Sequence, residues 1–318
     1  GDYVVDGVDT TGDLAIITEC ETIGGSLSVE FTSLTALDDL STLISVAGQF
    51  LITGNTSLTD LDGLSSLTSV GGQFLVASNT VLTHVDGLSK LTSVGGGLYI
   101  GFNPVLTHLD ALSNLTSLGG YLYLFDNTAL TQVDGLSGIT SVAGYVEIMN
   151  NASLTNVDGL SNITSVLGGE LTIEENDALT NVDGLSGITS MASYLWIWGN
   201  DGLTNLDGLS NLTSVGGELK IVDNSALAQV DGLSSLTWVG KGDLTIEDND
   251  VLAHVDGLSG LTSLAGDLFI RDNDALSNLD GLAGITSLGG YLRIWNNSAL
   301  THVDGLANLT SVGDFVII

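Results

Sequence analysis

The stretch LTSLGGYLYLFDNTALTQVDGLSGI, residues 115–139, recurs with variations through most of the 318-residue chain. Its asparagine marks the period, which is 24 residues with two steps of 25. The asparagines of this column are Asn55, Asn79, Asn103, Asn127, Asn151, Asn176, Asn200, Asn224, Asn249, Asn273 and Asn297. Both longer steps add a residue just before a strand-like run, in VLGGE (166–170) and VGKGD (239–243). This position indicates a corner where one more residue can bulge outward.

Apolar residues within the repeat follow two spacings. Leu122 and Leu124 alternate, which is typical of a strand with both side chains on one face. The others fall at every third position, as in Leu130, Val133 and Leu136, and this suits short extended or 3-10 segments joined by bends. Gly-Gly before the strand and Asp-Gly after it supply those bends. One repeat alone cannot bury its leucines, so neighbouring coils must share a core.

The sequence therefore predicts a mostly β protein: a right-handed parallel β-solenoid of about a dozen coils, with short 3-10 turns and little or no α-helix. We expect a single domain. Residues 1–48 form N-terminal capping coils, in which Leu14/Ile16 and Leu27/Val29 are strand-like runs. Residues 49–318 form the 24-residue repeat solenoid. It lacks a polar cap at its C-terminal end, where Phe315 and Ile317 are expected at inward positions.

These residues carry a resemblance to a known family. The pattern Leu-x-x-Leu-x-Leu-x-x-Asn resembles the leucine-rich repeat. The full unit, with Gly-Gly-x-Leu-x-Ile and Leu-x-x-Val-Asp-Gly-Leu, is similar to the receptor L-domain type of extracellular receptors and fungal cell-wall proteins. The resemblance implies a solenoid at an extracellular or cell-surface location, with a binding or structural role. L-domain ends are usually closed by disulfides, whereas this chain has a single cysteine, Cys20.

The charge of the chain is strongly acidic. Asp and Glu number 38 against 5 Lys and Arg, which gives a net charge of −33. This charge opposes binding to nucleic acid, which needs cations along the phosphates, and it opposes docking on anionic lipid. No apolar run is long enough for a membrane-spanning helix, so we expect no membrane insertion. The first residue is Gly1, which suggests a processed or trimmed start.

Stacked coils turn each repeat position into a column. The asparagine column is expected to satisfy backbone groups at the bend. An equally constant aspartate column can accept backbone N–H bonds as an Asx turn or as the cap of a one-turn helix, which would offset the repulsion between stacked carboxylates. The alternative is a ladder of bound Ca²⁺, with Asp134, Asp158 and Asp183 as weak candidates; Ca²⁺ prefers six to eight oxygen ligands, and the frame offers one carboxylate per coil.

Two further columns contain histidine and threonine. All four histidines share one column, where the other repeats place Asp, Asn or Gln, and this indicates a solvated position without zinc. The histidines are His84, His108, His254 and His302. Threonine fills another column, from Thr68 to Thr310, which resembles ice-binding faces; the plainer interpretation is β-branched residues fitting a strand-like corner. Asn-(Leu/Ile)-Thr sequons, which matter only in a eukaryotic secretory pathway, occur at Asn114, Asn162, Asn211 and Asn308.

The outward positions of the Leu-x-Leu strand vary from coil to coil. They hold six of the seven tyrosines and three of the four tryptophans. Exposed aromatics at this density favour recognition of a glycan or a protein, and cross-strand packing is the alternative. The candidate ligand-binding residues are Tyr99, Tyr121, Tyr123, Phe125, Tyr145, Tyr194, Trp196, Trp198, Phe269, Tyr291, Arg293 and Trp295.

Three functional hypotheses follow. Because no serine has a recurring base and orienting acid beside it, we expect no enzymatic activity. The first hypothesis is an adhesion or recognition protein that binds glycan or protein through the aromatic face. The second is a structural subunit of an extracellular fibre or coat, in which molecules join head to tail through Phe315, Val316, Ile317 and Ile318. The third is an ice- or mineral-surface-binding protein.

Overall fold

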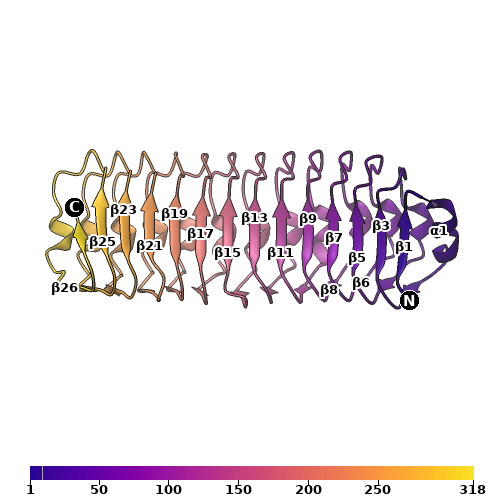
Figure 1. Ribbon diagram of the computed structural model, residues 1–318, viewed down its shortest axis with the longest axis horizontal. Coiled ribbons are helices and arrows are strands. Elements are labelled where there is room, and N and C mark those ends of the chain that lie inside the picture. Colours follow the sequence, from indigo (N-terminus) through magenta and orange to yellow (C-terminus); the bar gives the residue numbers. More distant parts are fainter. Residues whose placement is uncertain (9) are drawn as a thin grey trace. The chain divides into compact units, whose positions relative to one another are not determined.

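The computed structural model describes residues 1–8 and 10–318 as coils of parallel strands and 3-10 turns (Figure 1). The chain divides into two compact units. The first comprises Gly1–Leu154 with Asp158–Ile163, and the second comprises Thr155–Val157 with Thr164–Ile318. The single domain, with its boundary between residues 48 and 49, stays a prediction.

The first unit contains a sheet of four-residue strands and a sheet of two-residue strands. The longer strands are β1 (Tyr3–Asp6), β3 (Leu27–Glu30), β5 (Phe50–Thr53), β7 (Phe74–Ala77), β9 (Leu98–Gly101), β11 (Leu122–Phe125) and β13 (Val146–Met149). The shorter ones are β2 (Thr22–Ile23), β4 (Ser45–Val46), β6 (Ser69–Val70), β8 (Ser93–Val94), β10 (Ser117–Leu118) and β12 (Ser141–Val142). The helices are α1 (Thr10–Ile17), η1 (Asp38–Leu40), η2 (Asp62–Leu64), η3 (Asp86–Leu88), η4 (Asp110–Asn114), η5 (Asp134–Leu136) and η6 (Asp158–Leu160).

The second unit repeats this arrangement. Its longer strands are β15 (Leu171–Glu174), β17 (Leu195–Trp198), β19 (Leu219–Val222), β21 (Leu244–Glu247), β23 (Leu268–Arg271) and β25 (Leu292–Trp295), followed by β27 (Val316–Ile317). The shorter ones are β14 (Ser165–Val166), β16 (Ser190–Met191), β18 (Ser214–Val215), β20 (Trp238–Val239), β22 (Ser263–Leu264), β24 (Ser287–Leu288) and β26 (Ser311–Val312). Its 3-10 helices are η7 (Asp183–Leu185), η8 (Asp207–Leu209), η9 (Asp231–Leu233), η10 (Asp256–Leu258), η11 (Asp280–Leu282) and η12 (Asp304–Leu306).

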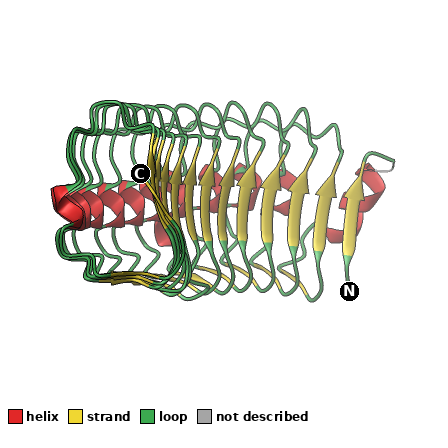
Figure 2. Ribbon diagram, turned by 60° about the vertical axis from the view of Figure 1, so that its left-hand side comes forward, coloured by secondary structure: helices red, strands yellow, loops and turns green. Residues whose placement is uncertain are grey.

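Strand register reproduces the sequence period. Leu122 of β11 pairs with Leu98 of β9 and with Val146 of β13, all in parallel. The inward Leu122 and Leu124 are fully buried, and so are the residues at every third position, such as Leu130. In Figure 2 the long strands and the one-turn 3-10 helices occupy different sides of each coil. The predicted parallel β-solenoid is confirmed.

The asparagine column forms a buried ladder, as predicted. Asn79 is fully buried, and its Nδ2 donates to the Ile52 carbonyl at 3.0 Å. Its Oδ1 accepts from both the backbone N–H and the Nδ2 of Asn55, each at 3.1 Å. One amide thus satisfies backbone groups at the bend and links neighbouring coils, because it has both donors and acceptors.

The two inserted residues lie at corners, which confirms the sequence interpretation. In the first insertion, Leu167 is 68% exposed and Gly169 has φ +78°. A left-handed φ is costly for a residue with a Cβ, so glycine suits this bend. In the second insertion, Lys241 is exposed. The strands on either side of this second insertion keep their register, with Leu219 paired to Leu244.

The N-terminal coils differ from the prediction at Leu14 and Ile16. These residues belong to α1, an eight-residue helix, and not to a strand. Leu14 and Ile17, three positions apart, are buried, whereas Ile16 is 64% exposed. Spacing by three places both buried residues on one helical face. The period of two that the sequence analysis assigned to this segment was wrong.

The expected frame of the last strand was wrong by one residue. Val316 pairs with the inward Leu292, and Ile317 pairs with the outward Arg293. Phe315 therefore continues the outward column of Tyr291, and the two ring centroids are 5.9 Å apart. Alternation reverses the face of every side chain after a one-residue shift.

The aspartate column begins each one-turn helix, but the Asx turn is formed two positions earlier. Asn181 Oδ1 accepts from the Asp183 N–H at 3.1 Å, and Asn205 Oδ1 accepts from the Asp207 N–H at 3.0 Å. An Asx side chain reaches the N–H two residues ahead of it, so the turn belongs to the preceding column. At Asp183 and Asp207 the expectation that the constant aspartate accepts this bond was wrong.

The threonine column links coils through its hydroxyls. Thr92 Oγ1 donates to the Thr68 carbonyl at 3.0 Å, and Thr68 Oγ1 donates to the Ile44 carbonyl at 3.0 Å. These bonds agree with the plainer interpretation of the column as residues fitting a strand-like corner. Ice or mineral binding stays a prediction, which thermal hysteresis measurements can test.

Candidate ligand-binding groove

The twelve candidate binding residues divide between the two units. Five lie on or directly before β9, β11 and β13 of the first unit: Tyr99, Tyr121, Tyr123, Phe125 and Tyr145. Seven lie on or directly before β17, β23 and β25 of the second unit: Tyr194, Trp196, Trp198, Phe269, Tyr291, Arg293 and Trp295.

In the first unit the tyrosines pack on one another across strands. The rings of Tyr121 and Tyr145 stack with centroids 4.9 Å apart and planes within 4°. Tyr99 meets Tyr123 edge to face at 5.0 Å. Such pairs stabilise neighbouring strands, so this group has the geometry of cross-strand packing, the alternative left open by the sequence.

Glycines on or directly before β9 let these rings lie close to the sheet. A Cβ at Gly97 would lie 2.5 Å from the Tyr121 ring, and one at Gly101 would lie 2.7 Å from the Tyr99 phenolic oxygen. Burial, followed by the nearby Tyr123, Tyr121 and Asp126, raises the pKa of Tyr99 to about 12. The Tyr99 phenol therefore stays protonated at neutral pH, and it covers the sheet instead of projecting from it.

In the second unit the outward side of the sheet is hollowed into a groove of about 550 Å³. We call it the aromatic groove. Its lining comes from six long strands and the residues just before them. The lining residues are Glu174, Trp196, Trp198, Glu218, Lys220, Val222, Asp243, Thr245, Glu247, Phe269, Arg271, Arg293 and Trp295.

Side-chain size explains the hollow. Trp198 stands on β17, whereas Trp295 stands on β25, four strands along the sheet. At about 4.8 Å per strand this separation is about 19 Å. Between them the lining includes the smaller Val222 and Thr245. These two short side chains, between large rings at both ends, contribute to the open trough.

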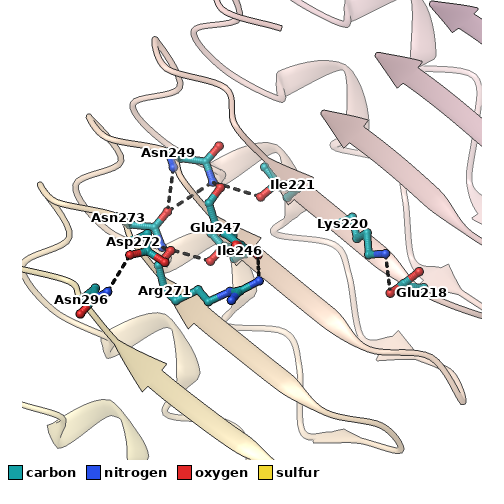
Figure 3. A network of polar contacts seen from close by, with 10 residues as sticks. All are labelled: Glu218, Lys220, Ile221, Ile246, Glu247, Asn249, Arg271, Asp272, Asn273 and Asn296. Carbon is teal, nitrogen blue, oxygen red and sulfur yellow. Dashed lines mark hydrogen bonds and ion pairs between the residues drawn. The ribbon is translucent and has the colours of Figure 1, made fainter. Parts of the chain in front are cut away.

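Two of the groove's cations are paired with carboxylates. Lys220 Nζ lies 3.0 Å from Glu218 and 4.5 Å from the centroid of the Trp196 ring. Arg271 donates to Glu247 at 2.6 Å (Figure 3). The sequence-based candidate list omitted both cations, although they occupy the same outward positions as the aromatic residues. The alternation of these cations with acidic residues at the outward positions is the sequence signal that could have identified them.

The two tryptophans on β17 differ in their surroundings. Trp196 donates from Nε1 to Glu218 at 3.1 Å and stacks on Tyr194 with centroids 4.4 Å apart. Trp198 is 40% exposed, and within the described residues its indole makes no hydrogen bond or ring contact. Trp196 is therefore fixed in place, whereas the Trp198 ring is open to a ligand.

Arg293 is the third cation of the groove. Its guanidinium lies over Tyr291 at 4.5 Å and over Phe269 at 5.2 Å, measured to the ring centroids. In the described part of the chain no carboxylate lies within 4 Å of it. Its Nε is buried without a hydrogen-bond partner. This cation is therefore held by aromatic rings and not by an ion pair.

A ladder of carboxylates lies directly after β19, β21 and β23. Asp223, Asp248 and Asp272 occupy this position with φ of 53–56°, the left-handed region. Asn296 continues the ladder and donates to Asp272 at 2.9 Å (Figure 3). Burial, followed by the charges of Glu247, Asp272 and Asp223, raises the pKa of Asp248, and Arg271 acts in the opposite direction.

The raised pKa of Asp248 predicts a pH-dependent effect of Asp248→Asn. A carboxyl group whose folded pKa exceeds its unfolded value stabilises the fold at low pH, and this stabilisation is lost as pH rises through the folded pKa. Asp248→Asn should therefore raise Tm at pH 7, and the gain should shrink by pH 3. Thermal unfolding followed by circular dichroism measures both values. Asp274→Asn, at an exposed position outside the ladder, is the control; an equal gain there would contradict the explanation.

The metal candidates do not form a cluster. Asp134, Asp158 and Asp183 begin η5, η6 and η7. Among residues 1–8 and 10–318 no group of three or more His, Cys, Asp or Glu side chains is placed to hold a metal ion. Ca²⁺ binding stays a prediction, tested by comparing Tm with and without a chelator.

The histidines lie beside the aspartate column. His84 Nδ1 is 3.4 Å from Asp86 and 3.8 Å from Asp62, and His254 Nδ1 is 3.3 Å from Asp256. The His84 side chain is 31% exposed, so the position predicted to be solvated is only partly so. In three of the four, His84, His108 and His254, Nδ1 is buried and makes no hydrogen bond.

The four residues predicted to mediate assembly are exposed. Phe315, Val316, Ile317 and Ile318 are 49–70% exposed. Self-association through them stays a prediction, which light scattering over a dilution series tests.

The repeat geometry identifies the type of solenoid. Each coil combines a parallel Leu-x-Leu strand, a buried asparagine and a 3-10 turn at 24- or 25-residue spacing. The fold is that of a leucine-rich-repeat solenoid. In the described residues no helix is long and apolar enough to cross a membrane.

No protein-family model and no curated protein matches the sequence, but solved structures do. One is TLR13 in its complex with ssRNA13, at 15% identity and a TM-score of 0.21; the match covers 92% of this chain and only 62% of that chain. Another is the functional domain of InlJ from Listeria monocytogenes, at 18% identity and a TM-score of 0.22, covering 94% and 73%. A third is a leucine-rich cell surface protein from Faecalibacterium prausnitzii, at 11% identity and a TM-score of 0.21, covering 98% and 83%.

Proposed function

We propose that this protein is a non-enzymatic recognition module, at an extracellular or cell-surface location, that binds a glycan in the aromatic groove. The observation that carries the proposal is the open Trp198 ring at one end of a groove of about 550 Å³. A ring with one free face can stack on the apolar face of a sugar, and nearby carboxylates can accept hydrogen bonds from its hydroxyls. The groove supplies both.

The size of the groove favours a glycan over a protein surface. Ligand pockets typically enclose about 300–1,000 Å³, and this groove falls within that range. A stable protein interface instead covers about 800 Å² on each partner. A protein partner that inserts a single loop is the competing possibility, and glycan-binding measurements distinguish the two.

Charge supports a ligand that is not a nucleic acid. The groove is lined by four carboxylates and three cations, in a chain of net charge −33. One of the matching solved structures contains RNA. Phosphate backbones, however, require a surplus of cations along their path. We therefore propose no RNA ligand for this chain.

The groove's acids also favour binding over catalysis. Glu218 and Glu247 are each paired with a cation, at 3.0 and 2.6 Å. Glycoside hydrolysis needs two carboxyl groups that act as acid and as base or nucleophile. Acids held in ion pairs suit hydroxyl recognition better than that reaction.

Trp198→Ala tests the proposal. Loss of an aromatic hot-spot contact typically costs 2 kcal/mol or more, so affinity for the bound oligosaccharide should fall about 30-fold. Isothermal titration against a panel of oligosaccharides measures this change.

Trp238→Ala is the matched control, because Trp238 is 48% exposed on β20 and is not among the groove residues. Its affinity should equal that of the wild type. Equal affinities for Trp198→Ala and the wild type would contradict the proposed site. Unchanged circular dichroism spectra verify that both variants are folded.

A further inference from the structure

Arg293 stands out in a chain with 38 acidic residues and only five cations. Three of these cations line the aromatic groove, and two of the three are paired with carboxylates. Arg293 is paired with none, and its buried Nε lacks a hydrogen-bond partner. A buried donor without a partner is destabilising, and guanidinium groups normally form ion pairs when desolvated.

Nearby acids are committed elsewhere. Asp267 Oδ1 accepts from the Tyr291 N–H at 2.8 Å, and Asp243 Oδ1 accepts from the Asp267 N–H at 2.9 Å. These carboxylates accept hydrogen bonds from backbone N–H groups at the bend before the strands. The guanidinium therefore remains available to an anionic group from outside the chain.

The neighbouring strand supplies a second arginine. Phe269 pairs with Arg293 and Arg271 pairs with Trp295, so arginines and rings alternate on β23 and β25. The two arginines are diagonal neighbours, and diagonal positions on a sheet are about 7–8 Å apart, within reach of long side chains. Arg271 also leaves its Nε without a partner, although its Nη2 donates to Glu247. Both arginines thus line the same end of the groove, and each has a buried Nε–H without a hydrogen-bond partner.

We propose that this end of the groove binds the carboxylate of an acidic sugar, so that the ligand is a uronic-acid-containing oligosaccharide. This inference rests on the proposed glycan function and names the class of glycan. Arg293 would hold the carboxylate with its planar fork of donors, assisted by Arg271. Trp198, about 19 Å away along the sheet, would stack on another ring of the same oligosaccharide.

The charge balance favours a single carboxylate over a more highly charged group. The lining carries four carboxylates and three cations, a local excess of one negative charge. A monoanion can be matched by Arg293 alone, whereas a dianion would also meet repulsion from the remaining acids. Binding should weaken with added salt, since part of it is electrostatic.

Matched oligosaccharide pairs test this inference. Each pair consists of a tetrasaccharide that contains one uronic acid residue and the same tetrasaccharide with that carboxyl group reduced to an alcohol. Pairs based on glucuronate, galacturonate, mannuronate and guluronate are titrated into the full chain by calorimetry. The wild type should bind the acidic member of at least one pair at least tenfold more tightly than the neutral member.

Variants of Arg293 locate the preference. Arg293→Met keeps an apolar stem over Phe269 and Tyr291. It should bind the two members of a pair with about equal affinity, and its affinity for the neutral member should equal that of the wild type. Arg293→Lys keeps the charge without the fork and should give an intermediate preference. Lys90→Met removes the same charge in the first unit, outside the groove, and should leave the preference unchanged.

The outcomes separate this inference from the proposed function. Equal binding of both members of every pair would overturn the acidic-sugar inference and leave glycan binding supported. A preference that survives in Arg293→Met would also overturn it, because the carboxylate would then bind elsewhere. Failure to bind any member of any pair would overturn both.

Discussion

Asn200→Ala is expected to lower the free energy of unfolding of the second unit by about 3–5 kcal/mol. The Asn200 amide is fully buried and serves several partners. Its Nδ2 donates to the carbonyls of Ile173 and Trp198 at 3.0 Å each. Its Oδ1 accepts from the backbone N–H of Asn176 at 3.2 Å. Alanine leaves these buried groups without partners, and each unsatisfied group costs about 1–3 kcal/mol.

Tryptophan fluorescence during guanidinium unfolding measures this loss, because all four tryptophans belong to the second unit. Asn211→Ala is the matched control. The exposed Asn211 donates from Nδ2 to the Ser186 carbonyl at 2.9 Å, and loss of this bond should cost less than about 1 kcal/mol. Equal losses in both variants would show that the ladder is not the main source of coupling between coils.

Gly208→Ala is expected to cost about 3 kcal/mol through overpacking. Gly208 lies in η8, where a Cβ would be 1.9 Å from the Val182 carbonyl oxygen of the preceding coil. That atom is backbone, so the coils would have to separate locally. Gly208→Val should be more destabilising still, because its side chain is larger and branched. Circular dichroism during chemical unfolding measures both variants.

The chain provides a natural comparison at Ala111. This alanine occupies the same repeat position in η4, where the 3-10 helix extends over five residues, Asp110–Asn114. The chain thus carries a Cβ at this repeat position in one coil. Ala111→Gly should therefore change stability by no more than about 1 kcal/mol. A loss for Gly208→Ala as small as this one would contradict the close-approach explanation.

The sequence predicted the repeated parts of the fold well because their cause is local and recurs. Residues equivalent to Leu122 and Leu124 face inward in the neighbouring coils. The buried asparagines Asn103 and Asn127 donate to equivalent backbone carbonyls. Segments that occur once gave no such check. The structure follows the helical spacing of Leu14 and Ile17, which are buried, and not the alternation of Leu14 and Ile16. A one-residue frame error at Phe315 likewise had no following repeat to expose it.

The candidate site was only partly predictable. Alternation placed Tyr121 and Trp198 correctly on the outward side, but it could not distinguish their surroundings. Tyr121 lies over Gly97 and stacks on Tyr145, whereas Trp198 remains open. This difference depends on the size of side chains on neighbouring strands. Comparing the columns strand by strand could have found it, and the same comparison would have added Lys220 and Arg271 to the site.

The four indole N–H groups provide the most direct test of the aromatic groove. Their signals in a ¹H–¹⁵N spectrum, assigned through single Trp→Phe variants, are followed while the acidic and reduced tetrasaccharides are added. We predict saturable shifts for Trp196, Trp198 and Trp295, which line the groove, and none for Trp238, which does not. Saturable binding that moves Trp238 and leaves the other three unchanged, or no saturable shift with any tetrasaccharide, would contradict the groove as the ligand site.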